Sequence, residues 1–246
     1  MAMLQSGMAS GDVVELAGKS IVITGGTTGI GRATAKLLVE AGAKVLLFGR
    51  HQKELDDALA EIGRARAEDR VHGVTADQSR NADIERVFAE ADSRIGGCDI
   101  LINNAAVGLG SFLETKYDDW LYEVQTNLVA YIACCRYAID RMKKKGWGHI
   151  VNVGSMSADL REPSNDVYVA TKAGIQAFSP RPIRRLSRFS FSAFPPHQPF
   201  SIAGACPDPA RREPRTCSRA QAATGPFEVG SASFPCLVHC ATRASQ

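Results

Sequence analysis

The chain has 246 residues, 45% of them apolar, which suits one globular domain with a sizeable core. It contains no run of about 18 apolar residues, and residues 1–18 lack the basic start and apolar stretch of a secretory signal, so we expect a cytoplasmic protein with no membrane partner. The seven cysteines are odd in number and lack the spacing of a disulfide framework, which favours reduced thiols. The net charge of +3 divides into −3 for residues 1–178 and +6 for residues 179–246.

Short apolar runs alternate with amphipathic stretches through residue 178, a pattern typical of parallel strands joined by helices. The expected strands are Ser20–Ile23, Lys44–Phe48, Val71–Thr75, Asp99–Ile102 and His149–Val153. The expected helices are Ile30–Ala41, Gln52–Arg64, Asn81–Ile95 and Tyr117–Lys145. This order predicts an α/β fold with a doubly wound, Rossmann-like parallel sheet, in which ligands bind beyond the carboxyl ends of the strands.

A glycine-rich segment, Thr24 to Gly31, follows the first strand and opens the first helix. Glycines let the backbone approach a pyrophosphate closely, and a helix start supplies free N–H groups and a positive dipole end. The alternative is a glycine-rich turn without a ligand, but the place between strand and helix favours binding. The candidate cofactor-binding residues in this segment are Gly25, Thr27, Thr28, Gly29, Ile30 and Gly31.

The loops after the next three strands add further candidates. An NAD site normally places an acid at the end of the second strand, but Arg50 stands there and can pair with a 2′-phosphate, so we expect NADP(H) rather than NAD. A solvated surface arginine is the alternative. Asp77, after the third strand, can accept from the adenine amino group or be an ordinary loop aspartate. Asn104 and Ala105, after the fourth strand, can tie loops together while leaving room for a cofactor.

The candidate catalytic residues are Ser155, Tyr168, Lys172 and Asn127. Tyr168 and Lys172, four residues apart, share one helical face, so the ammonium can favour the ionised form of the phenol. The phenol can then exchange a proton with a substrate oxygen, to which Ser155 donates a hydrogen bond. Asn127 is a polar residue in an otherwise apolar helix and can support a water-linked proton path to Lys172. A Tyr-x-x-x-Lys pair is weak by itself, and only the whole set is persuasive.

Taken together, these residues resemble the short-chain dehydrogenase/reductase family. The family's glycine motif falls on Thr24 to Gly31, its Asn-Asn-Ala-Gly on Asn103 to Ala106, and its helix asparagine on Asn127. Its serine falls on Ser155 and its Tyr-x-x-x-Lys on Tyr168 and Lys172; Ala106 replaces the family glycine. The resemblance implies that Tyr168 is the general acid or base and that Lys172 binds the nicotinamide ribose and favours the phenolate. It also implies that Ser155 positions the substrate and that Asn127 holds a water in the relay.

The resemblance covers about residues 16–178 and then stops. We expect a flexible extension over 1–16, a dinucleotide-binding and catalytic domain over 17–178, and an anomalous tail over 179–246. The tail contains ten of the eleven prolines and no lysine, and Pro180 should end the helix that carries Lys172. Because prolines 195, 196 and 199 stand where the family's sixth strand runs, we expect only five strands, an exposed edge and an irregular tail.

Three interpretations of the tail remain open. We favour out-of-frame translation over a native, divergent or disordered tail, because GC-rich DNA read out of frame gives sequence rich in arginine and proline. An arginine-rich tail for nucleic acid is disfavoured, since its arginines are dispersed and set no aromatic platform. The segment 236–240 offers two cysteines and a histidine but lacks a fourth ligand, so no metal site is expected.

The leading hypothesis is a reductase or dehydrogenase that moves a hydride between NADP(H) and a carbonyl or secondary alcohol. A protein that binds NADP(H) without turnover is the alternative, because the family's nicotinamide wall and substrate lid fall within the anomalous tail. The partner is then a small carbonyl or alcohol molecule, with no nucleic acid. The family commonly forms homo-oligomers through the long helix and the helix carrying the tyrosine, and the shortening of the latter makes this assembly doubtful here.

Overall fold

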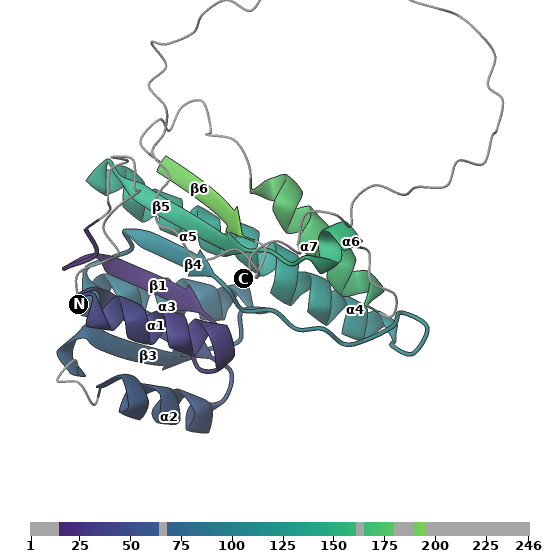
Figure 1. Cartoon of the computed structure of the whole chain (residues 1–246), viewed down its shortest axis with the longest axis horizontal. Coiled ribbons are helices and arrows are strands. Elements are labelled where there is room, and N and C mark those ends of the chain that lie inside the picture. The colour runs from purple at the N-terminus through teal and green to yellow at the C-terminus, as the bar shows by residue number, and fades with distance from the viewer. Residues whose placement is uncertain (1–14, 64–67, 161–164, 180–188, 195–246) are drawn as a thin grey trace, which may run out of the picture. The chain divides into compact units, whose positions relative to one another are not determined.

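The computed structural model describes residues 15–63, 68–160, 165–179 and 189–194. Its sheet has six parallel strands in the order β3-β2-β1-β4-β5-β6 (Figure 1). The strands are β1 (Ser20–Thr24), β2 (Lys44–Gly49), β3 (Val71–Thr75), β4 (Ile100–Asn103), β5 (Gly148–Val153) and β6 (Phe189–Phe194). The order reverses between β1 and β4, which confirms the predicted doubly wound sheet and places the ligand crevice at that point.

Helices connect the strands on both faces of the sheet. They are α1 (Gly29–Glu40), α2 (Gln52–Gly63), α3 (Asn81–Ile95), α4 (Tyr117–Val124), α5 (Ala130–Lys145), α6 (Ser157–Leu160) and α7 (Asp166–Phe178), with a 3-10 turn at Glu68–Arg70. The predicted long helix over Tyr117–Lys145 is interrupted by a π-helical turn, η2 (Gln125–Val129), between α4 and α5. A π turn inserts one extra residue into a helix and is frequent at functional sites. Asn127 lies inside this turn.

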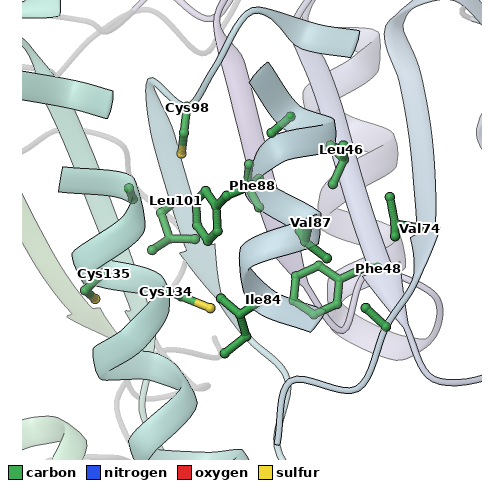
Figure 2. Packing of buried hydrophobic residues seen from close by; sticks show 14 of the residues in the cluster. Leu46, Phe48, Val74, Ile84, Val87, Phe88, Cys98, Leu101, Cys134 and Cys135 are labelled. Atoms are coloured by element: carbon green, nitrogen blue, oxygen red, sulfur yellow. The ribbon is translucent and has the colours of Figure 1, made fainter. Parts of the chain in front are cut away.

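Two apolar clusters form the core, one on each face of the sheet. Val22 of β1 packs with residues of α3 and α5, whereas its neighbours Ile21 and Ile23 pack with residues of α1 and α2. Figure 2 shows the first cluster, where Phe88 of α3 and Cys134 of α5 lie over the sheet. Because successive strand residues point to opposite faces, continuous apolar strands are buried on both sides. The sheet therefore holds the loops at its carboxyl edge on a rigid base.

The expectation that the sheet ends at β5 is wrong. Phe189–Phe194 pairs in parallel with Gly148–Val153 along its whole length and so covers the edge that we expected to be exposed. The strand is free of proline and contains three phenylalanines, which favour strands, and Pro195 comes only after its last residue. Prolines 195, 196 and 199 therefore follow this strand rather than interrupt it.

The end of α7 agrees with the sequence. The helix stops at Phe178, two residues before Pro180, and the Ser179 N–H closes it on the Ile175 carbonyl at 2.8 Å. Residues 1–14, 180–188 and 195–246 lie outside the described residues, and the last of these ranges includes the segment 236–240. The expectations of a flexible start, an irregular tail and out-of-frame translation therefore remain predictions. Over the ranges that are described, no helix is both long and apolar enough to cross a membrane.

Candidate functional site

A cavity of about 440 Å³ opens at the carboxyl ends of the strands. The glycine-rich loop after β1 lines one part of it, and the loops after β2, β3 and β4 line the rest. The predicted cofactor-binding residues that line it are Gly25, Thr27, Thr28, Gly29, Ile30, Arg50, Asp77, Asn104 and Ala105. Gly31, Tyr168 and Lys172 do not line this cavity. The structure thus brings together residues from four separate loops at the predicted crevice.

The glycine-rich loop is locked to the loop after β4 at backbone level. The Asn104 side chain donates from Nδ2 to the carbonyls of Thr24 and Gly25, both at 3.1 Å. In return, Thr24 Oγ1 accepts the N–H groups of Asn104 at 3.0 Å and Ala105 at 2.9 Å. A Cβ added to Gly31 would lie 2.1 Å from the Gly25 carbonyl oxygen, so only glycine permits this approach. The loop and the start of α1 form a closely packed cradle that fits a dinucleotide pyrophosphate.

Arg50 lies at the end of β2, where its exposed side chain borders the cavity. Its guanidinium donates to the Tyr122 hydroxyl and lies 5.7 Å from the centre of the Tyr122 ring. Among the described residues it forms no ion pair, so its charge is open to an anionic ligand. Glu54, in the first turn of α2, also lines the cavity. Sequence reasoning missed both Tyr122 and Glu54, although Glu54 stands only four residues after Arg50.

The loop after β3 is fixed by Gln78, which sequence reasoning also missed. Its side chain is 5% exposed, and Nε2 donates to the carbonyls of Ala105 at 3.2 Å and Thr126 at 2.7 Å. All three residues line the cavity, so one amide ties together the loops after β3 and β4 and the π turn. Asp77 forms a local turn instead, since its Oδ1 accepts the Ser79 N–H at 2.9 Å. A polar residue directly after a strand end is the signal that could have identified Gln78.

Tyr168 and Lys172 lie on α7, near the ends of β4 and β5. Lys172 is 1% exposed, its Nζ donates to the Val153 carbonyl at 2.9 Å, and the Tyr131 hydroxyl lies 3.4 Å away. The same Nζ is 5.6 Å from the centre of the Tyr168 ring, as the spacing of four residues predicts. Burial lowers the pKa of Lys172 to about 8. It also raises the pKa of the Tyr131 phenol, which is thus held neutral beside the amine.

Comparisons with known proteins agree with this arrangement. The model of the short-chain dehydrogenase family matches residues 19–187. The chain belongs to this family. It is 37% identical over 165 residues to D-beta-hydroxybutyrate dehydrogenase of Cupriavidus necator. The aligned region covers 67% of this chain and 63% of that protein. The corresponding enzyme of Rhizobium meliloti is 36% identical over 163 residues, or 65% of this chain and 63% of that one. The chain therefore spans less than two thirds of the length of these relatives.

Solved structures of short-chain dehydrogenases also share the fold. A protein of Novosphingobium aromaticivorans described as a short-chain dehydrogenase superposes with a TM-score of 0.68 at 28% identity, over 74% of this chain and 69% of that one. The apo form of LigO from Sphingobium sp. strain SYK-6 gives a TM-score of 0.66 at 27% identity, over 75% of this chain and 69% of that one. Short-chain dehydrogenases are oxidoreductases that use NAD or NADP. The cradle between the loops after β1 and β4 fits such a cofactor.

The family asparagine, Asn127, is fully buried in the π turn. Its Nδ2 donates to the Val107 carbonyl at 2.7 Å, and its Oδ1 accepts the Val107 N–H at 2.8 Å. Nδ2 also lies 3.3 Å from Thr171 Oγ1, next to Lys172. The side chain therefore joins the loop after β4 to α7. Its expected part in a water relay remains a prediction.

Ser155 follows β5 and is 7% exposed. Its hydroxyl donates to Ser157 Oγ at 3.1 Å and accepts the Ser157 N–H at 3.2 Å, so these contacts belong to the local turn before α6. The buried amides of Asn103 and Asn152 then join β4 and β5 at 2.9 Å, and Asn152 donates to Ser179 Oγ at 2.7 Å. The end of α7 is thereby held on the sheet. Within the described ranges, no cluster of three or more His, Cys, Asp or Glu side chains is arranged for a metal ion.

Proposed function

We propose that this chain transfers a hydride between NADP(H) and the carbon of a carbonyl or secondary alcohol, using Tyr168 to move the proton. The observation that supports this most directly is the buried Lys172 amine, 5.6 Å from the Tyr168 ring. Among the described residues, the hydrogen-bond partners of this amine are one carbonyl and one neutral phenol. Such burial is costly for an ammonium, and such costs are typical of functional sites. Tyr168 also lies near the cavity, because Val107 lines that cavity and a Cβ added to the next residue, Gly108, would lie 3.7 Å from the tyrosine ring.

Each side chain then has a definite task. In the direction of reduction, a nicotinamide held by the loops after β1 and β4 would supply the hydride to the carbonyl carbon. The Tyr168 hydroxyl gives its proton to the substrate oxygen, and the positive charge of Lys172 stabilises the phenolate that remains. Ser155 donates a hydrogen bond to the same oxygen, which holds the carbonyl in place. Oxidation of an alcohol runs through the same groups in reverse.

The preference for NADP(H) depends on the balance between two charged residues at the cavity. Arg50 is exposed there without an ion-pair partner among the described residues, which suits a charge-assisted pair with a 2′-phosphate. Glu54 lines the same cavity and suits the ribose hydroxyls of NAD instead. Arg50 directly follows β2, whereas Glu54 stands one helical turn later, and we therefore propose NADP(H) as the favoured cofactor.

A second candidate is a protein that binds NADP(H) without turnover. Two observations favour it: the Lys172 amine already donates to Val153, and the matched relatives extend well beyond the part that this chain resembles. In this case the cradle holds the cofactor, but no substrate is placed against Tyr168.

The deciding experiment pairs a fluorescence titration of NADPH with a screen of ketones and aldehydes that follows NADPH oxidation. Saturable binding with oxidation supports the enzyme, and binding without oxidation of any carbonyl supports the second candidate. If NADPH does not bind at all, both candidates are wrong.

A further inference from the structure

Tyr122 is a half-buried tyrosine of α4 that the proposed chemistry does not use. Its hydroxyl accepts a hydrogen bond from the Arg50 guanidinium, although the two residues are 72 positions apart in the chain. Within the described ranges, the Arg50 side chain makes no other hydrogen bond and no ion pair. The contact with Tyr122 therefore fixes where the charge of Arg50 lies.

The segment that carries Tyr122 is itself held at the cavity. Thr126, four residues after Tyr122, lines the cavity, and its carbonyl accepts a hydrogen bond from Gln78 Nε2 at 2.7 Å. Tyr122 is not one of the residues that line the cavity, whereas Arg50 is. We therefore expect Tyr122 to act on a bound ligand through Arg50 rather than by touching the ligand.

The contact also bears on the charge that Arg50 can offer to a ligand. Glu54 lines the same cavity, yet the guanidinium is bonded to Tyr122 and forms no ion pair with this acid. An arginine paired with an acid has less attraction left for an anion. An exposed arginine also samples many rotamers, and ordering such a side chain on binding costs free energy. Because Tyr122 restricts the guanidinium beforehand, less order remains to be imposed when a ligand binds.

We propose that Tyr122 is a positioning residue for cofactor selection, which holds the Arg50 guanidinium at the cavity for a phosphate monoester on the adenosine ribose. The guanidinium has five N–H donors and gives one to Tyr122, so the others remain for a bidentate contact with phosphate. The inference rests on the proposed function, because it takes Arg50 as the group that distinguishes NADP(H) from NAD. It adds that the distinction depends on a residue that does not itself line the cavity.

The test measures the contribution of the 2′-phosphate without any turnover. Isothermal titration calorimetry of the full chain gives the Kd for adenosine 2′,5′-bisphosphate and for adenosine 5′-monophosphate, which differ only in that phosphate. A loss of fold would weaken both ligands alike, so the ratio of the two Kd values isolates the contact at Arg50. The variants are Tyr122→Phe, Arg50→Ala and the double variant. Tyr117→Phe is the matched control, since Tyr117 is an exposed tyrosine of the same helix.

Tyr122→Phe should lower the preference for the bisphosphate by about two- to tenfold, because the ligand must then order Arg50 itself. In the Arg50→Ala chain the same change should alter the preference by less than about 1.5-fold, because a residue that acts through Arg50 has no effect in its absence. Tyr117→Phe should leave the preference within about 1.5-fold of the unaltered chain.

The outcomes separate this inference from the proposed function. An unchanged preference in Tyr122→Phe overturns the inference, and so does an equal loss with and without Arg50. If the preference depends on Arg50 but not on Tyr122, the proposed cofactor selection stands and the inference alone is wrong. If the unaltered chain does not prefer the bisphosphate, or if Arg50→Ala keeps the preference, the proposed selection fails and the inference fails with it.

Discussion

The two halves of the site are built in different ways. On the side of β1, β2 and β3, the cavity is bordered by exposed side chains such as Ile30, which is 62% exposed, and Arg50, although Gln78 on this side is buried and bonded. On the side of β4, β5 and α7, Asn127, Ser155 and Lys172 are buried and already bonded within the protein. The first half lines a cavity with side chains that a ligand can contact, whereas these side chains of the second half bond within the protein. Binding should therefore tolerate side-chain changes better than chemistry does.

The sharpest test of this contrast is Tyr168→Phe, which removes the hydroxyl that would transfer the proton and keeps the aromatic ring. Turnover should fall by about 10²–10⁴-fold, because the general acid or base is lost, while the Kd for NADPH stays within about twofold. Steady-state rates and a fluorescence titration on the same preparation measure the two effects. Near-normal turnover would eliminate the tyrosine mechanism and leave Ser155 as the nearest candidate donor.

Lys172→Met tests whether the buried charge of Lys172 lowers the free energy of unfolding. Below pH 8 the amine is charged in both folded and unfolded chains; between pH 8 and 10.5 only the unfolded chain holds the proton, so the stability of the unaltered chain rises with pH. The free energy of unfolding of the unaltered chain minus that of Lys172→Met should increase by about 3 kcal/mol between pH 7 and 10.5. Urea denaturation across this range measures it.

Lys44→Met is the matched control, since Lys44 is exposed. Its stability difference from the unaltered chain should not change across the same pH range. A flat difference for Lys172→Met as well would mean that the pKa of the amine is the same in the folded and unfolded chains, so that burial does not lower it.

Gly31→Ala probes the first half at a point where two loops approach each other closely. The new Cβ would meet the Gly25 carbonyl at 2.1 Å and Asn104 Nδ2 at 2.6 Å, so the loops must move apart. We expect a loss of about 3 kcal/mol in unfolding free energy and weaker NADPH binding. Gly174→Ala is the control, because its Cβ would meet only the end of the Leu128 side chain, at 3.2 Å. Equal melting temperatures for the two variants would contradict the packed cradle.

Arg50→Ala and Glu54→Gln separate the two charges in the first half. Loss of a charge-assisted phosphate contact costs on the order of 1.5–3 kcal/mol, so Arg50→Ala should lower the preference for NADPH over NADH by about ten- to a hundredfold. Glu54→Gln should raise that preference by a smaller factor, because it removes an acid near the phosphate. Titrations with both cofactors give the ratio. An unchanged ratio in Arg50→Ala would make Arg50 a surface charge only.

The sequence by itself determined the elements whose cause is local. Apolar periodicity gave β1 to β5 within a residue or two, the glycine-rich segment located the cradle, and the spacing of Tyr168 and Lys172 placed both on one helical face. The helix end at Phe178 followed from Pro180. These features depend on dihedral preferences and on residues close along the chain, which a linear pattern records.

Only the tertiary structure decided which polar groups are buried and what they contact. Nothing local distinguishes the buried Gln78 or Glu123 from solvated residues, and the two carbonyls that Gln78 binds belong to residues 27 and 48 positions away in sequence. The π turn around Asn127 and the pairing of β6 with β5 depend likewise on distant packing. Burial and pairing are properties of the assembled sheet, because they depend on which strands and loops become neighbours in space.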